Sequence, residues 1–179
     1  MAQFIAFDPN VEVSGAVILS FIAALEDDAR ALLREYGITH VTPTSWHHQQ
    51  TWLDAFRAIS EGDLGRLFDL VKVGTQIPRH AHWPPDIQTA EEALQSINEA
   101  YHMNHRGGEI GYYKAVPLEG GGVKMVCENP YPCDFDYGLL YGVAKLYLPK
   151  ETHVIVEHDP DGPCRKDGDD ACIYHISWE

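Results

Sequence analysis

The sequence predicts an α+β domain in which a helical N-terminal part, residues 1–105, packs on a C-terminal β-β-α-β-β unit, residues 106–179, with an antiparallel sheet. Apolar residues recur at helical spacing through most of the first part. After Arg106-Gly-Gly the pattern changes to short β-prone runs around one amphipathic helix. A chain of 179 residues is about one domain's worth, and it shows no internal repeat or linker. We therefore predict a single domain, 1–179.

Three helices are expected in the first half of the helical part. In residues 14–36 apolar side chains lie mostly four apart, and Gly37 follows, so this stretch predicts an amphipathic helix with a glycine stop. A second helix is expected to begin at residues 43–45 and to end at Gly62. A third is expected over residues 63–73.

A proline-rich segment separates these helices from the next. Its prolines are incompatible with a helix interior or a central strand, so residues 77–86 are predicted to form a loop. Thr89 and Glu92 then form the spacing of a capping box, which predicts a helix over residues 90–103.

The C-terminal part has the pattern of a small antiparallel sheet. A glycine run, Glu119-Gly-Gly-Gly122, separates two β-prone segments and predicts a hairpin. A helix follows, and two further strands complete the β-β-α-β-β order. The expected segments are strands 109–118 and 123–128, helix 134–148, and strands 152–158 and 172–178.

Charge and composition exclude several classes of partner. The chain has 13 basic and 27 acidic residues, a net charge of −14, with no stripe of Lys and Arg. We therefore expect no nucleic-acid surface and no binding to anionic membranes. No apolar run approaches the roughly 18 to 20 residues that span a bilayer. The start, MAQFIAFDPN, lacks the features of a secretory signal, so we expect a cytoplasmic protein without disulfides.

The four cysteines form the clearest candidate site. Cys127 and Cys133 form C-x5-C, Cys164 and Cys172 form C-x7-C, and each lies at the edge of a predicted element. Thiolates suit zinc or an iron–sulfur cluster, and a closed tetrahedral zinc site takes four Cys or His ligands. We therefore expect a metal, with zinc as the first choice.

The ligand set stays open. Cys127 continues an apolar run, where a buried core thiol is an equally good explanation. His158, Asp159 and Asp161 lie near enough in sequence to replace one cysteine. If the chain is instead a cysteine-based enzyme or a redox sensor, Cys133 beside the following helix N-terminus is the candidate reactive thiol.

Histidines and aromatic residues give a second candidate site. His102 and His105 lie three apart near a helix end and share a face, so they are candidate heme or metal ligands, although capping of helix carbonyls explains them as well. Apolar walls with a few polar groups are typical of small-molecule pockets. The candidate aromatic residues of such a pocket, each also explained by core packing, are Trp46, Trp52, Phe56 and Tyr101.

The segment from Cys164 to Trp178, Cys-Arg-Lys-Asp-Gly-Asp-Asp-Ala-Cys followed by Ile-Tyr-His-Ile-Ser-Trp, resembles the C-terminal signature of the 4-vinyl-reductase domain. In that domain C-x7-C precedes a final strand. The family is related in fold to the heme–nitric-oxide-binding domain and to a vesicle-tethering subunit family. The resemblance covers roughly residues 109–178. The stretch from Tyr101 to His105, Tyr-His-Met-Asn-His, is similar to uncharacterised bacterial proteins of this group.

The resemblance implies a structural zinc bound by Cys164, Cys172, an upstream cysteine and Asp161. The upstream ligand would be Cys133 or Cys127, whose separation from Cys164 departs from the family pattern. The resemblance also implies a sensor that binds a small hydrophobic or aromatic ligand in an apolar pocket between helices and sheet. A homodimer and a separate signalling output protein are implied as well.

We therefore expect a metal-stabilised small-molecule sensor and not an enzyme. The alternatives are a gas or redox sensor with heme or an iron–sulfur cluster, and a cysteine-based enzyme. A heme sensor is disfavoured because the sequence lacks the Tyr-x-Ser-x-Arg motif that holds heme propionates in the gas-sensing relatives. Phosphate-binding, nucleophile-elbow and His-Glu-x-x-His motifs are also missing from the sequence.

Overall fold

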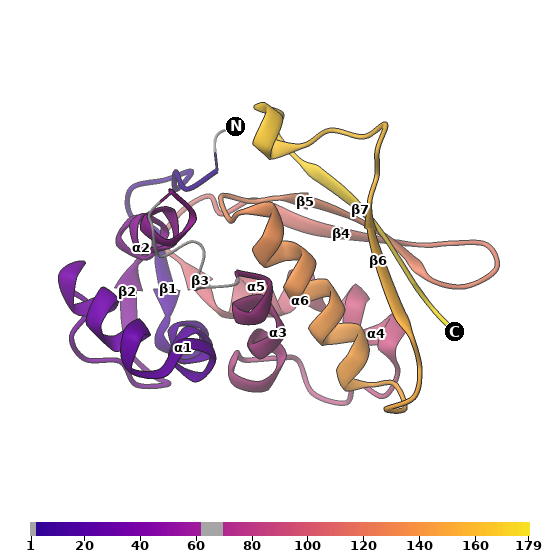
Figure 1. The fold of residues 1–179 in the computed structure, drawn as a ribbon, viewed down its shortest axis with the longest axis horizontal. Coiled ribbons are helices and arrows are strands. Elements are labelled where there is room, and N and C mark those ends of the chain that lie inside the picture. The colour runs from indigo at the N-terminus through magenta and orange to yellow at the C-terminus, as the bar shows by residue number, and fades with distance from the viewer. Residues whose placement is uncertain (1–2, 62–69) are drawn as a thin grey trace.

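A computed structural model describes residues 3–61 and 70–179. A helical end containing α1 and α2 lies on one side, and a four-stranded sheet covered by α6 lies on the other (Figure 1). The predicted α+β class is confirmed.

The helical end contains a small sheet that the sequence analysis did not predict. Strand β1 (Glu12–Ser14) pairs antiparallel with β2 (Trp46–His48) and with β3 (His105–Arg106). The expectation of an entirely helical first part was therefore wrong. Strands of two or three residues are too short to show alternation in sequence.

Helix α1 (Gly15–Glu35) covers the first predicted helix, but it is kinked at Glu26, whose φ of 52° is not helical and was not predicted. Ser14 caps it, because its side-chain oxygen accepts a hydrogen bond from the backbone N–H of Ala16. Helix α2 (Gln49–Glu61) begins later than predicted because the chain first forms β2. The predicted stop at Gly62 and most of the predicted helix 63–73 lie outside the described residues.

Two predictions for the next segment need correction. Helix α3 (Leu70–His80) includes Pro78, which was expected in a loop. Proline removes only one helix hydrogen bond in the last turn, and the helix ends two residues later. The predicted helix 90–103 is two helices, α4 (Ala90–Gln95) and α5 (Ile97–Met103), with Ser96 between them. The capping box of Thr89 and Glu92 is present in both directions.

The C-terminal β-β-α-β-β order is confirmed. The strands pair antiparallel in the order β4-β5-β7-β6, and α6 (Cys133–Leu146) connects β5 to β6. A short 3-10 turn, η2 (Arg165–Asp167), precedes β7. The strands are β4 (Tyr112–Pro117), β5 (Val123–Glu128), β6 (Val154–His158) and β7 (Cys172–Trp178).

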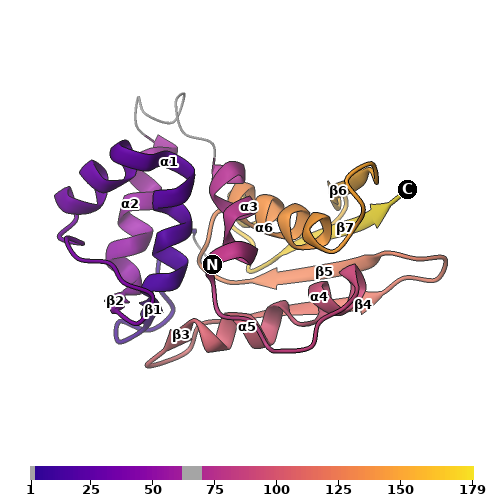
Figure 2. The ribbon, with the colours of Figure 1, turned by 90° about the horizontal axis from the view of Figure 1, so that it is seen from below.

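The sheet buries one face, because inward side chains alternate with partly exposed ones along β5. Helix α6 lies against this face, and α3 lies between α6 and the helical end (Figure 2). Glycines let α3 and α6 approach closely: a Cβ atom on Gly138 would lie 2.0 Å from the carbonyl oxygen of Val71. Among the described helices, none is both long and apolar enough to cross a membrane.

Candidate functional site

Three of the four cysteines meet at the corner where α6, η2 and β7 join. Cys133 is the first residue of α6, Cys164 precedes η2, and Cys172 begins β7. The Cys133 sulfur lies 3.2 Å from that of Cys172 and 3.9 Å from that of Cys164. Tetrahedral zinc with Zn–S bonds of about 2.3 Å would place its sulfur ligands roughly 3.8 Å apart. The three side chains, which we call the cysteine cluster, are thus spaced for one metal ion.

The other predicted metal ligands lie outside the cysteine cluster. Within residues 3–61 and 70–179, the cluster is the one group of three or more His, Cys, Asp or Glu side chains with ligand atoms within 4.8 Å of one another. Cys127 is fully buried in β5, opposite Cys172, and burial raises the pKa of its thiol. Asp161 is exposed in the loop after β6.

His158 lies next to the cysteine cluster without belonging to it. Its ring packs edge-on against Tyr174, whose hydroxyl donates to the backbone carbonyl of Cys133. Its Nδ1 donates to the carbonyl of Asp159, and its buried Nε2 has no partner among the described residues. An imidazole in this state has a free lone pair on Nε2, as metal-binding histidines do.

The environment of Cys172 favours its thiolate. A hydrogen bond from Cys133 and the positive charge of Arg165 lower the pKa of Cys172. The backbone N–H and the Nε of Arg165 both lie 3.4 Å from the Cys172 sulfur. The same hydrogen bond and burial raise the pKa of Cys133. Cys172 is therefore the cysteine of the cluster whose thiolate form is most stabilised by its neighbours.

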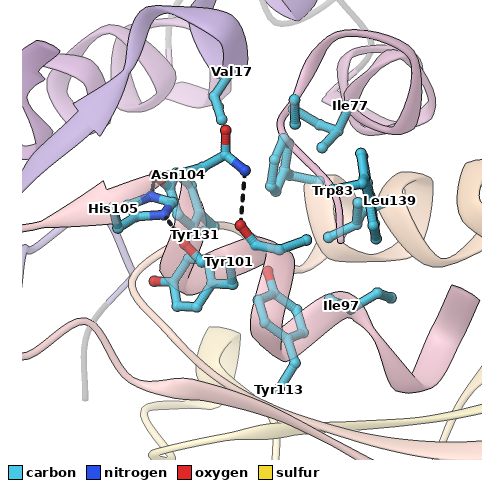
Figure 3. A pocket seen from close by; sticks show the side chains of 13 residues that line it. Val17, Ile77, Trp83, Ile97, Tyr101, Asn104, His105, Tyr113, Tyr131 and Leu139 are labelled. Carbon is cyan, nitrogen blue, oxygen red and sulfur yellow. Dashed lines mark hydrogen bonds between the residues drawn. The ribbon is translucent and has the colours of Figure 1, made fainter. Parts of the chain in front are cut away.

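A second site is an apolar pocket between the helical end and the sheet (Figure 3). The space within which the centre of a water molecule can move has a volume of about 40 Å³. Side chains from α1, α3, α5 and its C-cap, α6, β3 and β4 and from the loops before α4 and α6 form its walls. These residues are Val17, Ile77, Ala81, Trp83, Ile97, Ala100, Tyr101, Asn104, His105, Tyr113, Tyr131, Phe135 and Leu139.

One polar pair lies in the wall of this pocket. His105 and Tyr131 point toward one another, with 2.7 Å between Nε2 and the hydroxyl oxygen (Figure 3). The Nδ1 of His105 donates to the carbonyl of Tyr101 at 2.8 Å. Burial lowers the pKa of His105 to about 4. The imidazole is therefore neutral, and the Tyr131 hydroxyl donates to its Nε2.

The structure brings two of the six predicted binding residues into the pocket wall, Tyr101 and His105. Trp52 and Phe56 lie in an aromatic cluster of the core with Phe21. Trp46 and His102 lie away from the pocket. The Arg106 guanidinium covers the ring of Trp46, and His102 is exposed, with its Nδ1 donating to the carbonyl of Asn98.

The pocket wall also contains Trp83 and Tyr131, which were considered from the sequence but not selected, and Asn104, which was not considered. Asn104 holds the loop that carries Trp83, because its side chain donates to the carbonyl of His82 and accepts from the N–H of the same residue. Tyr131 had one available signal. A tyrosine flanked by Asn-Pro and Pro-Cys in a short loop beside a candidate ligand is well placed to be held in a fixed orientation.

The sequence matches no family model and no curated protein. Solved structures match in fold. An H-NOX protein from S. oneidensis in the Fe(II)NO state gives a TM-score of 0.66 at 12% identity, over 93% of this chain and 99% of that chain. An oxygen-binding H-NOX domain related to soluble guanylate cyclases, in its oxygen complex, gives 0.61 at 18% identity, over 92% of both chains.

A third structure, from work on heme redox potential and protein-induced porphyrin distortion, gives a TM-score of 0.62 at 18% identity, over 92% of both chains. At these identities the likeness concerns the fold. This chain has the H-NOX fold over almost its whole length. The fold relation to the heme–nitric-oxide-binding domain that the resemblance implied is thus confirmed.

Proposed function

We propose that this chain is a small-molecule sensor domain whose apolar pocket binds a compact apolar or aromatic ligand and whose cysteine cluster binds zinc. The observation that carries the proposal is the pocket itself: almost all its walls are apolar or aromatic, and its buried polar groups are neutral. Such a wall favours uncharged ligands, because a buried charge without a partner is costly.

The size of the pocket limits the ligand. One water needs roughly 10 to 15 Å³ of such space, so a cavity of about 40 Å³ accepts a few waters or a molecule of similar size. A larger ligand requires movement of a wall side chain, for which Trp83 is the candidate because it lies in a loop and is only partly buried. Its indole Nε1 has no partner among the described residues, so a ligand with an acceptor atom would satisfy it.

The fold supports the alternative of a heme-containing gas sensor, and His105 shares one feature with heme ligands. Its Nδ1–H bonds to a carbonyl, which directs the lone pair on Nε2 toward the pocket. The remaining residues do not fit heme. Tyr131 occupies Nε2, none of the described residues that line the pocket is Lys or Arg, and the cavity is far smaller than the roughly 300 Å³ at which cofactor sites begin.

Zinc fits the cysteine cluster. Cys133, Cys164 and Cys172 would supply three ligands. His158 or Asp161, which lie outside the cluster in this structure, would supply the fourth after a rearrangement of the segment between β6 and η2. The resemblance to the 4-vinyl-reductase domain implies the C-x7-C pair, an upstream cysteine and Asp161; His158 is a candidate because it lies nearby in sequence. Cys127 is proposed to remain a buried thiol. Bound zinc would join η2 and β7 to the first turn of α6.

Spectroscopy and elemental analysis of the purified protein test the cofactor proposals together. We expect about one zinc per chain and no absorption above 350 nm. A Soret band would support heme, and a broad visible band with labile sulfide would support an iron–sulfur cluster. Cys164→Ser should lose the zinc, whereas Cys127→Ser should keep it; zinc retained in Cys164→Ser contradicts the proposed site.

Thermal shifts test the pocket. Benzene, phenol and indole at millimolar concentration should raise the melting temperature if they bind the folded state. Ala100→Leu adds bulk to the pocket wall and should abolish the shift. Ala58→Leu is the matched control, since Ala58 lies in α2 away from the pocket. Equal shifts in both variants would contradict binding at this pocket.

A further inference from the structure

A chain of buried polar groups connects the pocket wall to the cysteine cluster. It begins at Tyr113 of β4, which lines the pocket and whose hydroxyl donates to Oδ1 of Asp136 at 2.6 Å. Asp136 lies in the first turn of α6 and forms an ion pair with Arg165 through Oδ2. Arg165 in turn donates from Nε to the sulfur of Cys172. We call Tyr113, Asp136 and Arg165 the bridging network.

The bridging network is almost completely removed from water. The exposed fraction is 0% for Asp136, 2% for Arg165 and 4% for Tyr113. Charges this deeply buried are retained only when they are paired, and loss of one partner costs several kcal/mol. Arg165 and Asp136 therefore have to move together. Asn129 fixes them further, because its backbone and side-chain oxygens accept from Arg165 and its Nδ2 donates to Asp136.

We propose that the bridging network couples occupancy of the pocket to retention of metal at the cysteine cluster. A ligand that displaces the Tyr113 hydroxyl removes one donor from Asp136. The carboxylate then relies more on Arg165, which weakens the hydrogen bond from Arg165 to Cys172. The Cys172 sulfur becomes a stronger electron donor to the metal. By thermodynamic reciprocity, metal binding changes ligand affinity by the same factor.

This inference rests on the proposed zinc site and pocket, and Tyr113→Phe tests it without altering a proposed ligand. The substitution keeps the ring and removes the hydroxyl. We expect the zinc affinity, measured by competition with a chromogenic chelator, to rise by about 5-fold or more, because Cys172 loses part of its hydrogen bond from Arg165 and becomes a stronger donor. The thiolate-to-metal band of the cobalt-substituted protein should shift as well, because the hydrogen bonding of Cys172 changes.

Tyr101→Phe is the matched control. Tyr101 is also buried and also lines the pocket, but its hydroxyl donates to the carbonyl of Ile110 and not to Asp136. It should bind zinc with the wild-type affinity and keep the wild-type cobalt spectrum. If both variants behave like the wild type, or if both change equally, the bridging network does not couple the sites.

A second measurement keeps this inference distinct from the zinc proposal. In metal-free protein, urea unfolding of Tyr113→Phe, Cys172→Ser and the double variant should be non-additive, because the bridging network joins the two residues. The pair Tyr101→Phe and Cys172→Ser should be additive. If the purified protein contains no zinc but only the Tyr113 pair is non-additive, the zinc proposal is contradicted and the coupling through the bridging network is supported. Additivity in both pairs would overturn the coupling.

Discussion

His105 shows how one buried side chain sets a pH dependence. Its pKa in the folded protein is lowered to about 4 by burial, whereas an unfolded histidine titrates near 6.5. The unfolded chain therefore binds more protons between these values, and stability falls as the pH decreases from 6.5 to 4. The Nδ1 of His105 donates to the Tyr101 carbonyl, and its Nε2 accepts from the Tyr131 hydroxyl. Protonation of Nε2 therefore also removes the acceptor of the hydrogen bond from Tyr131.

Replacing His105 tests this linkage. We expect the free energy of unfolding, measured with urea, to decrease between pH 7 and pH 4.5 in both proteins. The decrease should be about 2 kcal/mol smaller for His105→Gln than for the wild type. Exposed His153, which does not line the pocket, is the control, and the difference between wild type and His105→Gln should be the same when His153→Gln is added to both. Identical pH curves for wild type and His105→Gln would mean that His105 is charged or accessible in the folded protein.

Side chains at the ends of elements could be placed from the sequence better than side chains that pair only in the tertiary structure. The C-x7-C pair and Cys133 meet because strand and helix ends bring them together, and element boundaries can be estimated from sequence. Asp136 and Arg165 gave no comparable signal, because their pairing depends on how η2 folds back over α6. Trp52 and Phe56 were candidates for the pocket by composition, but side-chain direction on α2 places them in the core.

Helices α3 and α6 depend on glycine where they cross. An alanine Cβ at Gly138 would lie 2.0 Å from the Val71 carbonyl oxygen, far inside van der Waals contact. Gly→Ala in a free helix is favourable by about 1 kcal/mol. Here the helices would have to separate, so we expect Gly138→Ala to lower the free energy of unfolding by about 1 to 3 kcal/mol. Chemical denaturation measures the change.

The neighbouring residue provides the control for this substitution. Tyr137 is exposed, and its replacement by alanine removes a much larger side chain from the same helix. We nevertheless expect Tyr137→Ala to cost less than Gly138→Ala. The reverse order would show that the helices tolerate a wider separation than the structure has.

Elements with a long periodic pattern could be predicted, and those defined by pairing could not. Helix α1 and the strands β5 and β7 follow from spacing alone. Strands β1, β2 and β3 form because they hydrogen-bond to one another across distant parts of the chain, which no local pattern records. The break at Ser96 between α4 and α5 was also missed, because apolar residues continue at helical spacing on both sides.

At the scale of the whole molecule, the dominant feature is charge. The chain carries 27 acidic and 13 basic residues, and of the ion pairs formed by described residues, the one between Asp136 and Arg165 is fully buried. Most acidic groups are therefore exposed and repel one another. Such repulsion destabilises the compact state and is screened by salt, since the Debye length falls from about 30 Å at 0.01 M to about 8 Å at 0.15 M.

Stability should therefore rise with ionic strength. Between 10 and 300 mM NaCl we expect a gain on the order of 1 kcal/mol, which for a domain of this size raises the melting temperature by about 2 to 4 °C. Neutralising the exposed acidic run in α1 with Asp27→Asn and Asp28→Asn should reduce this salt response, because two of the repelling charges are removed. A melting temperature that falls with added salt would instead indicate that exposed ion pairs outweigh the net repulsion, since salt screens attraction and repulsion alike.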